Sequence, residues 1–232
     1  MFIAIPSLDK SFTCTLFMSA SQFDAIDRNS AKLVPFFEEY FPGVVDTLIN
    51  KSDLEEQYHS NPHLPLISIK CGPYHYNSSA VILGDAAHAM VPFYGQGMNA
   101  GLEDVRVLFE VLDEHANDSS ARATALSEYT TLRQPDAHAI NDLAMGNYQE
   151  MRSDVRSPWY LLRKKTEEAL NVWFPSLGFV TQYTRISFSN QRYSEVQEAV
   201  TKQGMQLSAA GFLLSAVAVT GTLATIWRLR LQ

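Results

Sequence analysis

The sequence contains few of the residues on which several common functional classes depend. Its only two cysteines, Cys14 and Cys71, exclude a disulfide framework. One bridge between them is an alternative, but reduced thiols in a cytosol-facing protein are the simpler interpretation. Lys and Arg total 18 against 25 Asp and Glu, and a net charge of −7 argues against a nucleic-acid-binding surface. Serine hydrolase chemistry is unsupported, because no Gly-x-Ser-x-Gly elbow occurs.

A dinucleotide fingerprint is also absent. No Gly-x-Gly-x-x-Gly follows a strand pattern anywhere in the 232 residues, and that motif normally places a pyrophosphate on a helix N-terminus. No amino-terminal signal peptide is apparent. The composition, 46% hydrophobic and 19% charged, indicates a globular chain of one or two domains with some membrane-like content.

The most informative segment that is present runs from residue 81 to residue 104. Three branched apolar residues predict a buried strand that ends at Gly84-Asp85, where open α/β sheets gather their ligands. Asp85 is expected to accept hydrogen bonds from sugar-like hydroxyls. Gly95 and Gly97 let the backbone approach a flat ligand. Met98 and Asn99 fall in the first turn of the next helix, whose free amides and dipole favour an anionic group. The segment therefore predicts a cofactor site.

His88 follows Asp85 by three residues. With no second ligand at metal spacing, a structural role is favoured over metal binding. We predict no metal site and assign no catalytic side chain.

This segment resembles the second flavin motif of the class A FAD-dependent aromatic hydroxylases. The shared residues are Gly84-Asp85-Ala86-Ala87-His88, Pro92, Gly95, Gly97, Asn99, Gly101 and Asp104. Residues 10–17, Asn147-Tyr148, 150–152 and the hydrophobic tail extend the likeness along almost the whole chain. One departure is Val91-Pro92, where many members of the class carry Pro-Pro.

The resemblance implies an α/β, Rossmann-like FAD-binding fold, which as a fragment would be α+β, followed by helices. It also implies that FAD, NADPH and O2 are used to add one oxygen atom to an aromatic ring, with L-kynurenine of tryptophan catabolism as substrate. In this class Asp85 would hold the ribityl hydroxyls, with Met98 and Asn99 at the isoalloxazine edge. The cofactor carries the difficult chemistry, so no side chain need be a general base.

Three residues are predicted to contact the substrate. Phe93 would form a wall of the pocket beside the flavin, although aromatic side chains are as often core. Asn147 and Tyr183 match positions where the class places substrate contacts, and an amide and a phenol suit an amino-acid ligand. By residue type alone, each is more often structural.

Because members of the class open with the missing fingerprint, the chain is expected to be a carboxyl-terminal part. The predicted divisions are 1–80, the remainder of the substrate sheet; 81–115, the second FAD motif; 116–203, a helical region; and 204–227, a transmembrane tail anchor. Two alternatives stay open: a non-catalytic, membrane-tethered remnant, and a hydroxylase of another aromatic acid or phenol.

The tail anchor rests on a run without charge from Gly204 to Trp227. About 20 apolar residues span a bilayer, and Lys202 before the run and Arg228 after it suit basic anchors. A buried core helix is the alternative. Gly211 and Ser215 could let a second copy approach, but such spacing is commonplace, so a homo-oligomer stays open. The resemblance implies the mitochondrial outer membrane, with the catalytic part facing the cytosol.

Periodicity predicts the remaining elements. Strands are expected at 11–18 and 66–70, and short helices at 35–40 and 44–49. Longer helices are expected at 99–115, 121–131, 137–155 and 157–172, with Pro135 marking a kink or a fresh start.

Overall fold

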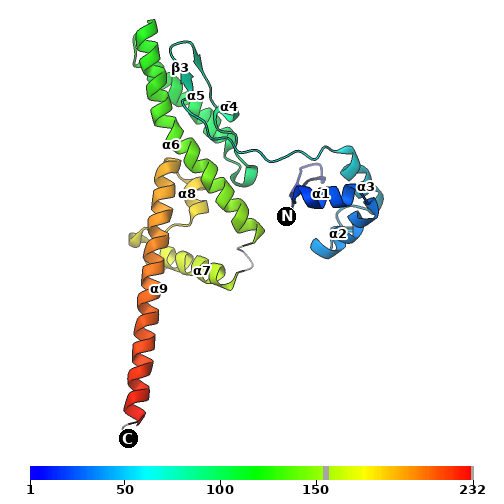
Figure 1. The fold of residues 1–232 in the computed structure, drawn as a ribbon, viewed down its shortest axis with the longest axis vertical. Helices are drawn as coiled ribbons and strands as arrows, with labels where there is room; N and C mark the ends of the chain where they lie inside the picture. The colour runs from blue at the N-terminus through cyan, green and yellow to red at the C-terminus, as the bar shows by residue number, and fades with distance from the viewer. Residues whose placement is uncertain (154–156, 231–232) are drawn as a thin grey trace. The chain divides into compact units, whose positions relative to one another are not determined.

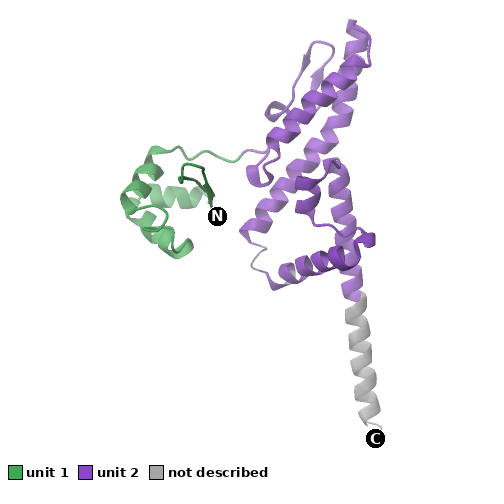
Figure 2. Ribbon diagram, turned by 180° about the vertical axis from the view of Figure 1, so that it is seen from behind, with its two compact units in different colours: residues 1–66 green, residues 67–232 purple. Residues whose placement is uncertain are grey.

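A computed structural model describes the backbone of residues 1–153 and 157–230, and the side chains of these residues except 159 and 213–230. The chain divides into two compact units, residues 1–66 and 67–232 (Figure 2). Helices dominate both units.

Unit 1 is a hairpin with three helices. Strand β1 (Phe2–Pro6) pairs antiparallel with β2 (Phe12–Leu16), so that Phe2 lies opposite Leu16. The helices are α1 (Ala20–Asp27), α2 (Leu33–Tyr40) and α3 (Lys51–Ser60), with a short 3-10 helix η1 (Ser30–Lys32) before α2. Their apolar faces form one core, composed of Ile26, Leu33, Phe37, Leu54 and Tyr58.

Unit 2 begins with a small hairpin and the predicted motif. Strands β3 (His75–Tyr76) and β4 (Ala80–Val81) pair antiparallel. They are followed by α4 (Asp85–His88), the 3-10 helix η2 (Pro92–Tyr94) and α5 (Gly97–Asp113). The remaining elements are α6 (Ser119–Arg152), α7 (Pro158–Trp173), η4 (Pro175–Leu177), α8 (Gln182–Phe188) and α9 (Tyr193–Arg230) (Figure 1).

The long helix α6 is the centre of unit 2. On its first half, Leu126 and Tyr129 pack with Leu108 of α5 in one buried cluster. On its second half, Ile140 packs with Val196 of α9 in another. The motif loop lies over α6, because Ala87 belongs to the first cluster and Tyr94 to the second. Two parts of the motif loop are therefore packed against one helix.

The described residues are mostly helical, and neither of their two sheets is parallel. The predicted buried strand at 81–83 is realised only as the two-residue β4, and Ile82 is 38% exposed. Within the described chain β4 has a single strand neighbour, β3, and Val81 and Leu83 are partly buried against the cluster on the first half of α6. The predicted strand is therefore mostly not formed, and the described residues are mostly helical with two small antiparallel sheets.

Two local predictions are also wrong, and one of two alternatives is excluded at Pro135. Residues 66–70 are not a strand: Ile67 is exposed, and the segment makes no ladder. Residues 44–49 form a turn and not a helix, because Asp46 adopts a positive φ of 64° that a helix cannot accommodate. Pro135 lies inside the continuous helix α6. The helix therefore does not start again at Pro135, although proline has no N–H to donate to the carbonyl four residues before it.

Other local predictions are confirmed. The predicted strand at 11–18 contains β2, the helix at 35–40 lies in α2, and those at 99–115 and 157–172 correspond to α5 and α7. Within the described residues, no helix is both long and apolar enough to cross a membrane. The predicted segment 204–227 lies largely outside the described side chains.

Candidate functional site

The motif turns sharply between β4 and α4. Gly84 adopts φ 57°, a conformation that costs other residues energy, and its Cα lies against Gly101 of α5. This contact places the end of the β3–β4 hairpin directly against α5. Asp85 is then the first residue of α4.

One side of the motif is open to solvent. Asp85 is exposed, and its carboxylate forms no hydrogen bond or ion pair with the described residues. Met98 is 75% exposed in the first turn of α5, and Asn99 next to it is also exposed. No side chain caps α5, so its first amides are free to donate toward a ligand. We call Asp85, Met98 and Asn99 the exposed face.

The motif also contains a buried charge cluster around Asp104. This fully buried carboxylate accepts the Gly84 amide at 2.8 Å and Arg133 Nε at 2.8 Å, and it lies 2.5 Å from Nε2 of His88. Burial disfavours the charged carboxylate, but the hydrogen bonds from His88, the Gly84 amide and Arg133 outweigh it and lower the pKa of Asp104. The motif's turn is thereby fastened to α5 and α6.

The cluster continues toward α9. Arg133 also donates to Asp136, at 3.3 Å. Asp136 in turn accepts Nε of Arg192 at 3.0 Å and the Ser194 hydroxyl at 2.6 Å. We call Asp104, His88, Arg133 and Asp136 the buried cluster. It connects the motif with the start of α9.

The loop between α4 and α5 is held from the helical region. Gly95 adopts φ 63° with open space around it, which ends η2 and starts the approach to α5. Gln182 of α8 donates to the Tyr94 hydroxyl at 2.6 Å, and Tyr193 of α9 donates to Gln96 at 3.1 Å. Burial raises the pKa of Tyr94 to about 12, so its hydroxyl stays neutral at physiological pH. Gly97 then opens α5.

The predicted substrate residues lie near this loop. Phe93 stacks on Tyr148 at 4.6 Å between ring centroids. The amide of Asn147 donates to the Phe93 carbonyl at 2.9 Å, which fixes the loop. Tyr183 is 57% exposed and stacks on Tyr94 at 6.4 Å. Phe93 and Asn147 are thus brought together, and Tyr183 is connected to the loop through Tyr94.

The sequence interpretation assigned no role to several residues that hold the site. They are Gln96, Arg133, Asp136, Gln182, Arg192 and Tyr193. The position of Gln96 within the Gly-Gln-Gly motif could have identified it as part of the site. No local sequence pattern marks Arg133 or Tyr193. Among the described residues, no group of three or more His, Cys, Asp or Glu side chains could hold a metal ion.

The sequence that forms this exposed turn, glycine-rich loop and uncapped helix matches a known protein family. The family model of the FAD binding domain matches residues 17–144, and the chain belongs to this family. Individual relatives match a larger part of the chain than the family model does. The chain is 56% identical to the kynurenine 3-monooxygenase of Emericella nidulans over 98% of this chain and 47% of the relative.

Two further relatives carry the same name. The kynurenine 3-monooxygenase of Phaeosphaeria nodorum is 60% identical over 90% of this chain and 42% of its own length. That of Chaetomium globosum is 60% identical over 89% of this chain and 45% of its own length. The chain therefore spans about half the length of the curated relatives that it matches.

The residues of the exposed face fit the flavin end of FAD. An unpaired carboxylate at Asp85 suits hydroxyl donors, and an exposed thioether at Met98 suits the flat apolar face of a ring. The uncapped amides of α5 suit an anionic edge. The chain has no Gly-x-Gly-x-x-Gly for the pyrophosphate, so the fit covers one end of the cofactor.

Proposed function

We propose that this chain forms the flavin-proximal and helical part of an FAD-dependent, NADPH-using monooxygenase. Its substrate is L-kynurenine, and its product is 3-hydroxykynurenine. The observation that carries the proposal is the exposed face: a free carboxylate at Asp85 lies in the same motif as an uncapped helix that presents Met98 and Asn99. The names of the relatives supply the substrate.

In this proposal the exposed face holds the cofactor. Asp85 accepts hydrogen bonds from the ribityl hydroxyls, and the backbone at Gly95 and Gly97 approaches the ring without a side chain between. The backbone N–H groups of Met98 and Asn99 bind the electron-rich edge of the isoalloxazine. FAD, when bound, supplies the redox chemistry by which NADPH and O2 deliver one oxygen atom.

The substrate lies beside the η2 loop in this proposal. Phe93 forms a wall against the kynurenine ring, and its stacking on Tyr148 keeps that wall rigid. Asn147 uses its NH2 group on the Phe93 carbonyl, which leaves its carbonyl oxygen to accept the substrate's amino group. The exposed Tyr183 hydroxyl donates to the substrate carboxylate.

We also propose that residues 204–227 anchor the protein in the mitochondrial outer membrane, with the catalytic part facing the cytosol. The support is the charge-free run and its basic flanks. A fluorescent protein fused before Met1 is expected on mitochondria, and to leave them when residues 204–232 are removed. Release of the full-length fusion by carbonate extraction would contradict a spanning helix.

The activity is tested in a chimeric holoenzyme. The amino-terminal part of the Emericella nidulans relative, up to the point where its match with this chain begins, is joined to residue 1 of this chain. Their 56% identity makes a compatible interface a reasonable design. We expect bound FAD and NADPH oxidation that kynurenine stimulates, coupled to hydroxylated product.

Three comparisons separate the alternatives. Equal coupling with simple phenols, which lack the amino-acid arm, would defeat the kynurenine assignment and keep the hydroxylase class. A folded chimera without FAD would support the non-catalytic remnant. The 232-residue chain alone, in detergent, is expected to bind FAD weakly, and a yellow chromophore that survives gel filtration would contradict the missing pyrophosphate site.

A further inference from the structure

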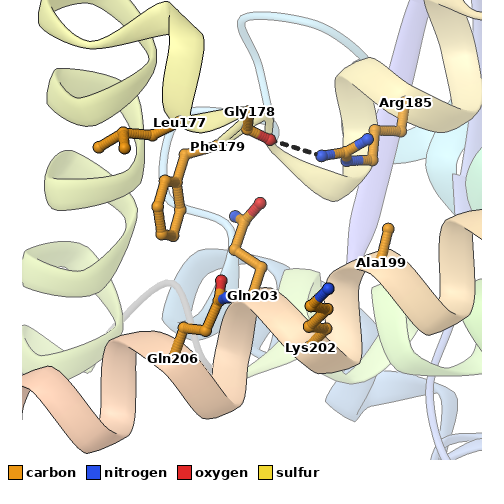
Figure 3. Close-up of a pocket in the computed structure, with 8 residues that line it drawn as sticks. All are labelled: Leu177, Gly178, Phe179, Arg185, Ala199, Lys202, Gln203 and Gln206. Atoms are coloured by element: carbon orange, nitrogen blue, oxygen red, sulfur yellow. Dashed lines mark hydrogen bonds between the residues drawn. The ribbon is translucent and has the colours of Figure 1, made fainter.

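A hollow lies in unit 2, away from the FAD motif. It has a volume of about 190 Å³ and is formed where η4 and the segment before α8 lie over α9. Figure 3 shows Phe179 closing one side and Arg185 the other, with Lys202, Gln203 and Gln206 on α9. Neither the family match, at residues 17–144, nor the proposed substrate residues include it.

The charged groups of this hollow have one sign. Arg185 and Lys202 are cationic, and within the described part of the chain no carboxylate forms an ion pair with either. The chain has seven more acidic than basic residues, and four of its described Arg side chains form ion pairs with Glu or Asp, whereas Arg185 does not. A hollow with two unpaired cations favours an anionic ligand.

The hydrogen-bond groups also favour an acceptor ligand. Arg185 donates through Nη2 to the Gly178 carbonyl at 2.7 Å and through Nη1 to Gln191 at 3.3 Å. Its Nε is buried and has no partner among the described atoms. Gln203 accepts the Val180 amide at 3.2 Å with its oxygen, which leaves its NH2 group to donate.

The donors come from two sides of the hollow. In Figure 3 the Lys202 ammonium and the Gln203 amide rise from α9, and the Arg185 guanidinium lies across from them. Several donors around one small space suit a tetrahedral oxyanion, since a phosphate offers acceptors in several directions at once. A volume of about 190 Å³ leaves room for one such group.

We propose that this hollow binds a phosphate group, either the headgroup of an anionic lipid or free phosphate. The lipid source rests on the proposed membrane anchor, because the charge-free run begins at Gly204, two residues after Lys202 on the same helix. A phosphate bound here would lie at the level where such an anchor leaves the folded unit. The free-phosphate source needs neither the membrane nor FAD.

The test uses the full 232-residue chain in an uncharged detergent, with calorimetric titration of two probes. The first is inorganic phosphate, and the second is dihexanoyl phosphatidic acid, a short-chain lipid. Saturable binding of either supports the hollow. Equal affinities identify free phosphate as the source, whereas affinity at least about tenfold higher for phosphatidic acid identifies the lipid.

The variant Lys202→Gln keeps an exposed polar side chain and is expected to weaken binding about tenfold, with unchanged circular dichroism. The matched control is Lys165→Gln, which removes an exposed lysine of α7 and should leave affinity within about twofold. No saturable binding of either probe, or equal weakening by both substitutions, overturns the proposal. Neither result bears on the hydroxylase function, because no readout depends on FAD.

Discussion

The motif carries two aspartates whose surroundings are opposite. The carboxylate of Asp104, in the buried cluster, accepts hydrogen bonds from three groups of the protein: the Gly84 amide, His88 and Arg133. The carboxylate of Asp85, in the exposed face, accepts no hydrogen bond from the described residues. A carboxylate whose partners are all internal organises the fold, and one without internal partners is available to a ligand. One short segment therefore separates a structural role from a binding role.

The buried cluster and the exposed face should also differ in how much they contribute to the free energy of unfolding. Removing one partner of a buried ion pair leaves an uncompensated charge and costs about 3–5 kcal/mol. An exposed substitution away from special features usually changes the free energy of unfolding by less than about 0.5 kcal/mol. Stability measurements and ligand measurements should consequently respond to different residues of the same motif.

The largest expected effect is on the buried side. Asp104→Ala should lower the free energy of unfolding by about 3–5 kcal/mol, because it leaves Arg133 short of a partner and the Gly84 amide without an acceptor. Urea unfolding of the 232-residue chain, followed by circular dichroism, measures this. Asp85→Ala is the matched control and should change stability by less than about 0.5 kcal/mol. Equal losses would remove the distinction between the two sides.

The next effect belongs to the exposed side. In the chimeric holoenzyme, Asp85→Ala should weaken FAD binding by about 1.5–3 kcal/mol, because the ribityl hydroxyls lose a charged acceptor. The dissociation constant follows from fluorescence quenching of FAD. Asp113→Ala removes an exposed carboxylate at the far end of α5 and should leave the constant unchanged. Unchanged affinity in Asp85→Ala would show that this carboxylate does not bind the cofactor.

The free energy of unfolding at low pH should depend on the buried carboxylate of Asp104. The pKa of Asp104 in the folded chain lies below its ordinary value of 3.8. Its contribution to stability is therefore present above that value and is lost as pH falls toward the folded pKa, at up to about 1.4 kcal/mol per pH unit. Asp104→Asn should remove this component from the pH dependence of the unfolding free energy below about pH 3.9. Parallel curves for the two proteins would contradict a depressed pKa.

The smallest effect concerns the substrate. In the chimera, Tyr183→Phe should raise the KM for kynurenine by the equivalent of about 0.5–3 kcal/mol while FAD stays bound, because only one hydroxyl contact, to an exposed carboxylate, is lost. Tyr76→Phe, which changes an exposed tyrosine in β3, serves as control. An unaltered KM would leave Tyr183 as a packing partner of Tyr94, and loss of FAD would indicate misfolding.

Local elements were predictable where local rules decide them. The apolar spacing of α5 and the Ser157-Pro158 start of α7 suffice to place both helices. The same rules failed at 44–49, where the positive φ of Asp46 decides the conformation. They also failed at 66–70, since an apolar run becomes a strand only if a neighbouring strand pairs with it.

The glycine-rich loop, the carboxylate at Asp85 and the likeness to FAD-dependent hydroxylases could all be identified from the sequence alone. Tertiary structure alone decided which carboxylate is buried. Arg133 reaches Asp104 across 29 positions, and Tyr193 reaches Gln96 across 97. Such pairings depend on how α5 and α9 pack against α6, and no local spacing encodes that packing. Burial then assigns the roles, because a charge removed from water must find its partners within the fold.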